Sequence, residues 1–223
     1  MKLSHLLPAI ALAFPLASYA ESEFSYDYLE LSATQITAEL EETNDELSAN
    51  RYAFKFSKEL PFQLFTRADV IYQNADNKVD VNGNGNTVRV KQDTYGYILH
   101  LGRYFELHNR VNALVTLVHS RGHSNVEQKI TRTGIVGDIK YKKNDVDLNS
   151  GIDAGLRIHL DSEKRFEFSP VVRTLFDSDG TDTAFEVGFG FKPLQNLQLL
   201  ATYLTEPGDA NLQQASLGAR WHF

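Results

Sequence analysis

The chain ends with Ser216-Leu217-Gly218-Ala219-Arg220-Trp221-His222-Phe223, and this stretch decides the fold. Its odd-numbered positions are apolar, whereas its even-numbered positions are polar or small. Such alternation with a period of two is typical of a β-strand whose two faces meet different surroundings. The segment therefore predicts a strand with one apolar and one polar face.

The same octet resembles the C-terminal assembly signal of bacterial outer-membrane β-barrels. That signal places a polar residue, a glycine and two aromatic residues at fixed spacing, which Ser216, Gly218, Trp221 and Phe223 match. The resemblance implies a barrel in the cell outer membrane. It also implies that the barrel-assembly machinery recognises this last strand.

The beginning of the chain predicts export. Residues 1–20 contain a lysine near the start, then an apolar run, then small residues ahead of the acidic Glu21. This order is typical of a cleavable secretory signal, and two prolines disfavour a retained helix. We expect removal of residues 1–20, which leaves 21–223 as a single barrel domain.

Period-two alternation continues along the rest of the chain. Segments such as 52–57, 94–102 and 148–160 alternate apolar with polar or small residues, and turn residues separate them. About ten segments can be counted from a strand near 24–33, and single-chain bacterial barrels have even strand numbers. We therefore predict an all-β fold, an antiparallel transmembrane up-and-down barrel of about ten strands. The alternative is eight strands with a long outer hairpin around 135–141.

One face of the expected strands carries charged residues in mid-strand. A narrow barrel has an interior that side chains can fill. Opposite charges inside it should pair, because an unpaired buried charge is costly. The predicted lumen charge network consists of Glu30, Lys55, Arg67, Asp69, Asp153, Arg157, Glu167, Arg173, Glu186, Lys192 and Arg220.

The links between the expected strands alternate between short and long. Residues 161–165 are a short link, whereas 35–49, 74–92 and 120–145 are long ones. Outer-membrane barrels keep short turns in the periplasm and longer loops outside. We therefore expect both termini on the periplasmic side and recognition residues in the three outer loops.

In pattern, residues 21–223 resemble small monomeric barrels such as the OmpA transmembrane domain and OmpX. The resemblance implies a monomer in contact with outer-membrane lipids and lipopolysaccharide, without a cofactor. We expect a non-enzymatic barrel with a structural or surface-binding role through the outer loops 35–49, 74–92 and 120–145. The sequence does not name a surface ligand, and the alternative is a small pore for ions or small solutes.

An envelope enzyme that acts on lipid A is a weaker alternative. The cluster His119–Glu127 brings imidazoles, hydroxyls and a carboxylate together, which are the groups of nucleophilic catalysis. Outer-membrane lipid A deacylases separate His from Ser by one residue, however, whereas His123 directly precedes Ser124. We therefore predict no catalytic residues.

Charge and composition exclude other classes of function. The chain carries 22 Lys and Arg against 29 Asp and Glu, a net charge of −7, and lacks cysteine. An acidic chain without a basic stripe is a poor candidate for nucleic-acid binding. The run from Asp80 to Gly85 resembles the start of a calcium loop, but Lys91 stands where a bidentate Glu is needed, so we expect a turn and no metal site.

Overall fold

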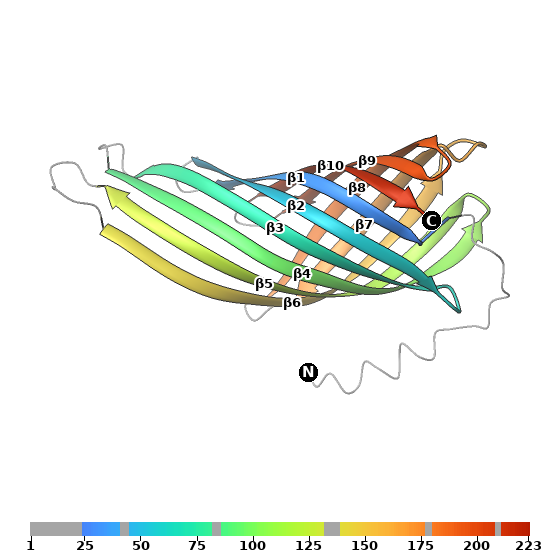
Figure 1. The fold of residues 1–223 in the computed structure, drawn as a ribbon, viewed down its shortest axis with the longest axis horizontal. Coiled ribbons are helices and arrows are strands. Elements are labelled where there is room, and N and C mark those ends of the chain that lie inside the picture. Colours follow the sequence, from blue (N-terminus) through green and yellow to red (C-terminus); the bar gives the residue numbers. More distant parts are fainter. Residues whose placement is uncertain (1–23, 41–44, 82–85, 132–138, 177–179, 208–210) are drawn as a thin grey trace, which may run out of the picture.

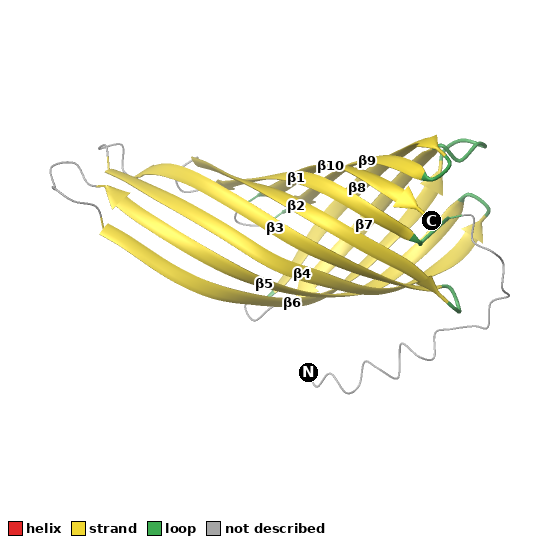
Figure 2. Cartoon of the chain, viewed as in Figure 1, coloured by secondary structure: helices red, strands yellow, loops and turns green. Residues whose placement is uncertain are grey.

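The computed structural model describes residues 24–40, 45–81, 86–131, 139–176, 180–207 and 211–223 (Figure 1). The predicted secretory signal and its expected cleavage point lie outside these residues. In the described part, the chain consists of strands and the turns that join them (Figure 2). No helix in these ranges is long and apolar enough to cross a membrane.

Ten antiparallel strands form one closed barrel, in which each strand pairs with its sequence neighbours and the first pairs with the last. The strands are β1 (Tyr28–Leu40), β2 (Asp45–Leu60), β3 (Leu64–Val81), β4 (Asn86–His108), β5 (Val111–Thr131), β6 (Ile139–His159), β7 (Phe166–Phe176), β8 (Thr181–Leu194), β9 (Leu197–Glu206) and β10 (Leu212–His222). The predicted fold class and strand number are confirmed. The eight-strand alternative is wrong, because β6 pairs along its length with β5 and also with β7.

The register sorts side chains onto two surfaces. Glu30 on β1 lies opposite Lys55 on β2 and Arg220 on β10, and it is 3% exposed. The next residue, Leu31, lies opposite Phe54 and is 64% exposed. Charged side chains thus point into the barrel and apolar side chains point out, which is the reverse of a soluble β-protein and typical of a barrel in lipid.

The strands differ greatly in length. β3 to β6 have 18 to 23 residues, whereas β7 to β10 have 10 to 14. The long strands therefore run past the short ones at one end, here called the long-hairpin end, which lies to the left in Figure 1. The opposite end, with the four tight turns and the C-terminus, is the short-turn end.

The expectation of long outer loops needs correction. Most of 35–49, 74–92 and 120–145 is strand among the described residues, and 41–44, 82–85 and 132–138 within these ranges lie outside them. The physical reason is that the alternation continues: Val79 faces Val88 across β3 and β4 on one side of the sheet, while Lys78 faces Arg89 on the other. Paired strands satisfy their backbone groups, so the hairpins extend instead of forming loops.

The expected first strand also starts later than predicted. β1 begins at Tyr28, and residues 24–27 turn into the short-turn end of the barrel. Phe24 and Tyr26 are almost completely buried there, at 1% and 3% exposure. Because their period-two pattern continues that of β1, the sequence did not distinguish a strand from an inserted segment.

One short turn is held by its own carboxylate. Asp161, between β6 and β7, accepts backbone hydrogen bonds from Arg165 at 3.2 Å and Phe166 at 2.9 Å. These N–H groups stabilise the ionised carboxylate and hold the pKa of Asp161 below its usual value.

Candidate functional site

An aromatic cluster fills the short-turn end of the lumen. Tyr26 stacks on Phe65 at 4.8 Å and on Tyr104 at 4.5 Å between ring centroids, and Phe24 belongs to the same buried cluster. The Tyr104 hydroxyl donates a hydrogen bond of 2.5 Å to Glu59. The N-terminal segment thus packs inside the barrel against β3 and β4 and obstructs this mouth.

Arg157 joins the aromatic cluster to the charged part of the lumen. Its guanidinium donates two hydrogen bonds of 2.8 Å to Glu167 on the neighbouring strand. The same group lies 4.9 Å from the Tyr26 ring and 5.0 Å from the Phe24 ring. A paired and stacked arginine tolerates burial well, because its charge is neutralised and its flat face meets an aromatic ring.

Two further carboxylates are ion-paired in the lumen. Glu30 accepts from Lys55 at 2.6 Å and from Arg220 at 2.8 Å, so one carboxylate ties β10, β1 and β2 together. Asp69 accepts from Arg67 at 2.9 Å. The first bridge spans the seam where the ends of the barrel meet.

The last group joins β6 to the short strands β7 and β8. Arg173 on β7 pairs with Asp153 on β6 at 3.0 Å and lies 3.8 Å from Glu186 on β8. Lys192 points into the barrel but has no ion pair within 4 Å among the described residues. The structure therefore brings ten of the eleven predicted lumen residues into ion pairs and leaves out Lys192.

Polar lumen residues that the sequence analysis missed complete this interior. Arg51 donates to Gln73 at 2.8 Å and to Gln214 at 3.4 Å, and Gln198 donates to Glu167 at 3.3 Å. The position of Arg51, four residues before Lys55 on the same strand face, was a usable signal. The glutamines carry no charge to mark them in the sequence.

The terminal octet divides between the two surfaces. Ser216 hydrogen-bonds Thr34 across the seam at 2.8 Å, whereas Trp221 and Phe223 are exposed on the outside. Gly218 lies where a Cβ would come within 3.1 Å of the Leu31 carbonyl oxygen, which explains a small residue there. The octet closes the barrel, and its recognition by the assembly machinery stays a prediction.

The His119–Glu127 cluster is split by the sheet. His123 is exposed on the outside, whereas Ser124 is buried inside and bonds Thr94 at 2.9 Å. The two side chains lie on opposite faces and do not form a nucleophile and base. On the outside, His119 hydrogen-bonds Ser150 of β6 at 3.1 Å, with no carboxylate bonded to that imidazole among the described residues.

The structure offers no support for a metal centre within the described ranges. No group of three His, Asp or Glu side chains there is arranged to hold an ion. Residues 82–85 of the calcium-like run lie outside the described part of the chain.

The extension at the long-hairpin end is a four-stranded sheet. β2 pairs with β3 only as far as Ala75, and β7 pairs with β6 only as far as Ser150. In the described structure, residues 76–81 and 139–149 therefore have a strand partner on one side only. The inner face carries apolar residues such as Val79, and the outer face carries charges of both signs, such as Arg89 paired with Asp76 and Lys142 paired with Glu127.

Comparison with solved structures identifies the fold. The transport unit of the autotransporter AIDA-I from Escherichia coli matches with a TM-score of 0.56 and 12% identity over 97% of both chains. The translocator domain of NalP from Neisseria meningitidis matches at 0.50 and 10% over 90% of both, and the β domain of the Bordetella autotransporter BrkA at 0.50 and 15% over 88% of this chain and all of the other. No protein-family model and no curated protein sequence matches the chain. At these identities the likeness concerns the fold alone, and the chain has the fold of outer-membrane β-barrels.

Proposed function

We propose that the protein is a non-enzymatic barrel of the outer membrane that presents a four-stranded sheet for binding at the cell surface. The observation that carries the proposal is the extension of β3 to β6 past the end of the short strands (Figure 1). Its two one-sided edges expose backbone donors and acceptors, which are ready to pair with an extended segment of another protein.

The lumen supports a binding role over conduction. Ion pairs between adjacent strands and the aromatic cluster around Tyr26 occupy the interior. A pore for ions or small solutes is the second candidate, and the polar upper lumen around Arg51 favours it. Planar-bilayer recordings separate the two: we expect the folded protein to give no stable single-channel steps, and reproducible steps would favour the pore.

The proposal also includes contact with lipid, a monomeric state, recognition by the assembly machinery and an orientation in the membrane. The apolar outer face requires lipid around it. The chain closes its own sheet without a second copy, which favours a monomer. The terminal strand is the segment that we propose the assembly machinery recognises. Short turns then lie in the periplasm and the extension lies outside.

The orientation can be tested because the chain has no cysteine. We expect Lys78→Cys, on the extension, to react with a membrane-impermeant maleimide in intact cells. Arg165→Cys, in a short turn at the other end, is the matched control and should react only after the outer membrane is broken. The opposite labelling pattern would refute the orientation.

Surface binding is tested with shortened hairpins. Replacing 76–91 and 127–142 by tight turns removes the one-sided edge of β3 and the outer part of the one-sided edge of β6, and leaves the ion-paired barrel intact. We expect cells that display this variant to lose adhesion to coated laminin, fibronectin or collagen, or to one another, relative to the full-length protein. Equal adhesion on every surface would leave only a structural role.

A further inference from the structure

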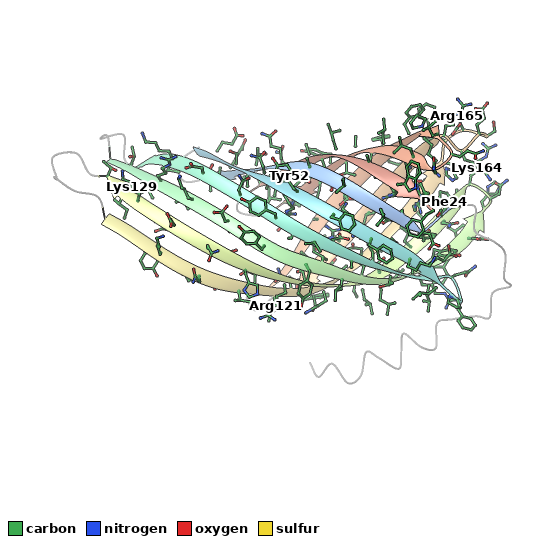
Figure 3. All side chains as sticks on the ribbon, viewed as in Figure 1. Phe24, Tyr52, Arg121, Lys129, Lys164 and Arg165 are labelled. Carbon is green, nitrogen blue, oxygen red and sulfur yellow. The ribbon has the colours of Figure 1, made fainter. Side chains whose placement is uncertain are left out.

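The lipid-facing wall of the barrel carries a cation in an otherwise apolar setting. Arg121 on β5 is exposed on the outside, directly between Tyr97 of β4 and Leu148 of β6 (Figure 3). Its side chain has no hydrogen bond, ion pair or ring contact with any residue that the structure describes. His119 and His123 occupy the outward positions on either side of it.

The height of Arg121 places it at a membrane surface. β5 starts at Val111 at the short-turn end, and Arg121 lies ten residues further along this strand. At about 3.3 Å per residue and a strand tilt of about 40°, this corresponds to a rise of ~25 Å, the height of the apolar band in such barrels. One further outward position beyond His123, the surface becomes polar with Asp93, Asn125 and Asn144 in one row.

A hollow in the outer wall ends at Tyr95 and Gly96 on β4, one strand away from this cation. It has a volume of about 770 Å³ and is lined mainly by outward side chains of β10, β1, β2, β3 and β4. The strand register shows two cross-strand rows that line the hollow and continue without a break into β5. These rows are Ala219–Leu31–Phe54–Val70–Tyr97–Arg121 and Leu217–Ala33–Tyr52–Tyr72–Tyr95–His123.

The two rows rise from the short-turn end towards the long-hairpin end. On β1 the first row passes through Leu31, three residues after the strand begins at Tyr28, and on β5 it passes through Arg121, ten residues after Val111. The β1 side of the hollow is therefore low in the proposed membrane, its β4 side reaches the level of His123 at Tyr95, and the cation lies at the upper margin of the membrane. This order, apolar below and cationic above, is complementary to a lipid whose acyl chains lie beneath an anionic headgroup.

We propose that this surface binds lipopolysaccharide, with acyl chains of lipid A in the hollow and a lipid A phosphate on Arg121 and His123. An arginine facing lipid is destabilising unless its charge reaches the interface. A guanidinium binds phosphate through paired, charge-assisted hydrogen bonds. Tyr95 and Tyr97 contribute amphipathic rings at the depth of the headgroups.

This inference rests on the proposed location in the outer membrane, and the test separates the two. The full-length folded protein is mixed in detergent with bis-phosphorylated lipid A, and bound lipid is counted by native mass spectrometry across a concentration series. Insertion is followed in the same preparation from heat-modifiable migration on gels after transfer into lipid vesicles. Failure to insert refutes the proposed function, whereas insertion without lipid A binding refutes only the inference.

Variants test whether lipid A binding depends on the charge of Arg121. We expect Arg121→Gln to weaken lipid A binding about tenfold, the loss that corresponds to one charge-assisted hydrogen bond, and Arg121→Lys to restore most of it. Arg165→Gln removes the same charge at the opposite end and should bind as the original protein does. Equal binding by Arg121→Gln, or an equal loss in Arg165→Gln, would overturn the site.

The ligand is tested in parallel. Dephosphorylated lipid A should bind about tenfold more weakly than the bis-phosphorylated form, and phosphatidylglycerol should not compete at equal concentration. Equal binding of dephosphorylated lipid A would show an acyl-chain surface without a phosphate site. Full competition by phosphatidylglycerol would show a general anion surface, which also contradicts the proposal.

Discussion

Replacement of Glu30 by glutamine should weaken the seam of the barrel. This carboxylate is 3% exposed and lies within 2.6 Å of Lys55 and 2.8 Å of Arg220. Glu30→Gln removes the negative charge and leaves the inward cations Lys55 and Arg220 without their carboxylate partner. Removal of one partner from a buried pair costs about 3–5 kcal/mol, because an uncompensated charge is left behind. We expect the free energy of unfolding to fall by about 3 kcal/mol, since glutamine keeps one acceptor.

The assay uses the only tryptophan of the chain. Trp221 on β10 pairs with Leu29 on β1, so its fluorescence reports on the same seam during urea unfolding in lipid vesicles. Glu163→Gln is the control, because Glu163 pairs with Arg165 in an exposed turn and should change stability by less than about 1 kcal/mol. If the two variants lost equal stability, the seam pair would be as well solvated as a surface pair, and the reasoning about a filled lumen would be wrong.

Three further changes test other parts of the molecule. Phe24→Ala combined with Tyr26→Ala removes the aromatic cluster from the short-turn end, and we expect single-channel steps in planar bilayers where the original protein gives none; continued silence would show that the ion pairs alone close the lumen. Asp161 has a lowered pKa, so its contribution to stability is present above the unfolded value of about 3.9 and is lost as the pH falls through the folded value. An NMR titration midpoint for this carboxyl below 3.8 is expected, and a midpoint above 3.8 would contradict the turn geometry. Deletion of Phe223 should lower the amount of assembled barrel in the outer membrane several-fold while refolding in detergent persists; an equal loss in both would point to stability and not to recognition.

The sequence predicted the parts of the fold that depend on periodicity. Ten strands and the facing of their side chains follow from alternation, because a strand sends successive side chains to opposite surfaces. Glu30 and Leu31 illustrate this: a shift by one residue would place the carboxylate in lipid, so the chemistry of the two surfaces fixes the register. The same reasoning located ten lumen residues that prove to be ion-paired.

Strand ends were harder to predict, because alternation does not say where pairing stops. Residues 24–27 continue the period of β1 but leave the sheet and fill the lumen, where Tyr26 finds Phe65, a residue 39 positions away in the sequence. Such a contact depends on the barrel diameter, which is a property of all ten strands together. The long hairpins posed the reverse problem: polar residues around Asn74 and Gln92 suggested loops, yet cross-strand pairing continues beyond them.

The His119–Glu127 cluster shows why spacing must be interpreted together with the secondary structure. In a loop, His123 and Ser124 would be neighbours with a common function, but in a strand they face opposite environments. Once the segment is a strand, residues two apart share a face, and His119, Arg121 and His123 form one line on the lipid side in which the Arg121 guanidinium is the cation. Arg121 and His123 interrupt two apolar rows of the outer wall, which continue on β6 as Leu148 and Val146, so residues of the cluster that was considered for catalysis are better placed to hold an anionic headgroup. An unpaired guanidinium on a lipid-facing wall needs a partner from the membrane, and a phosphate at the level of the headgroups provides one.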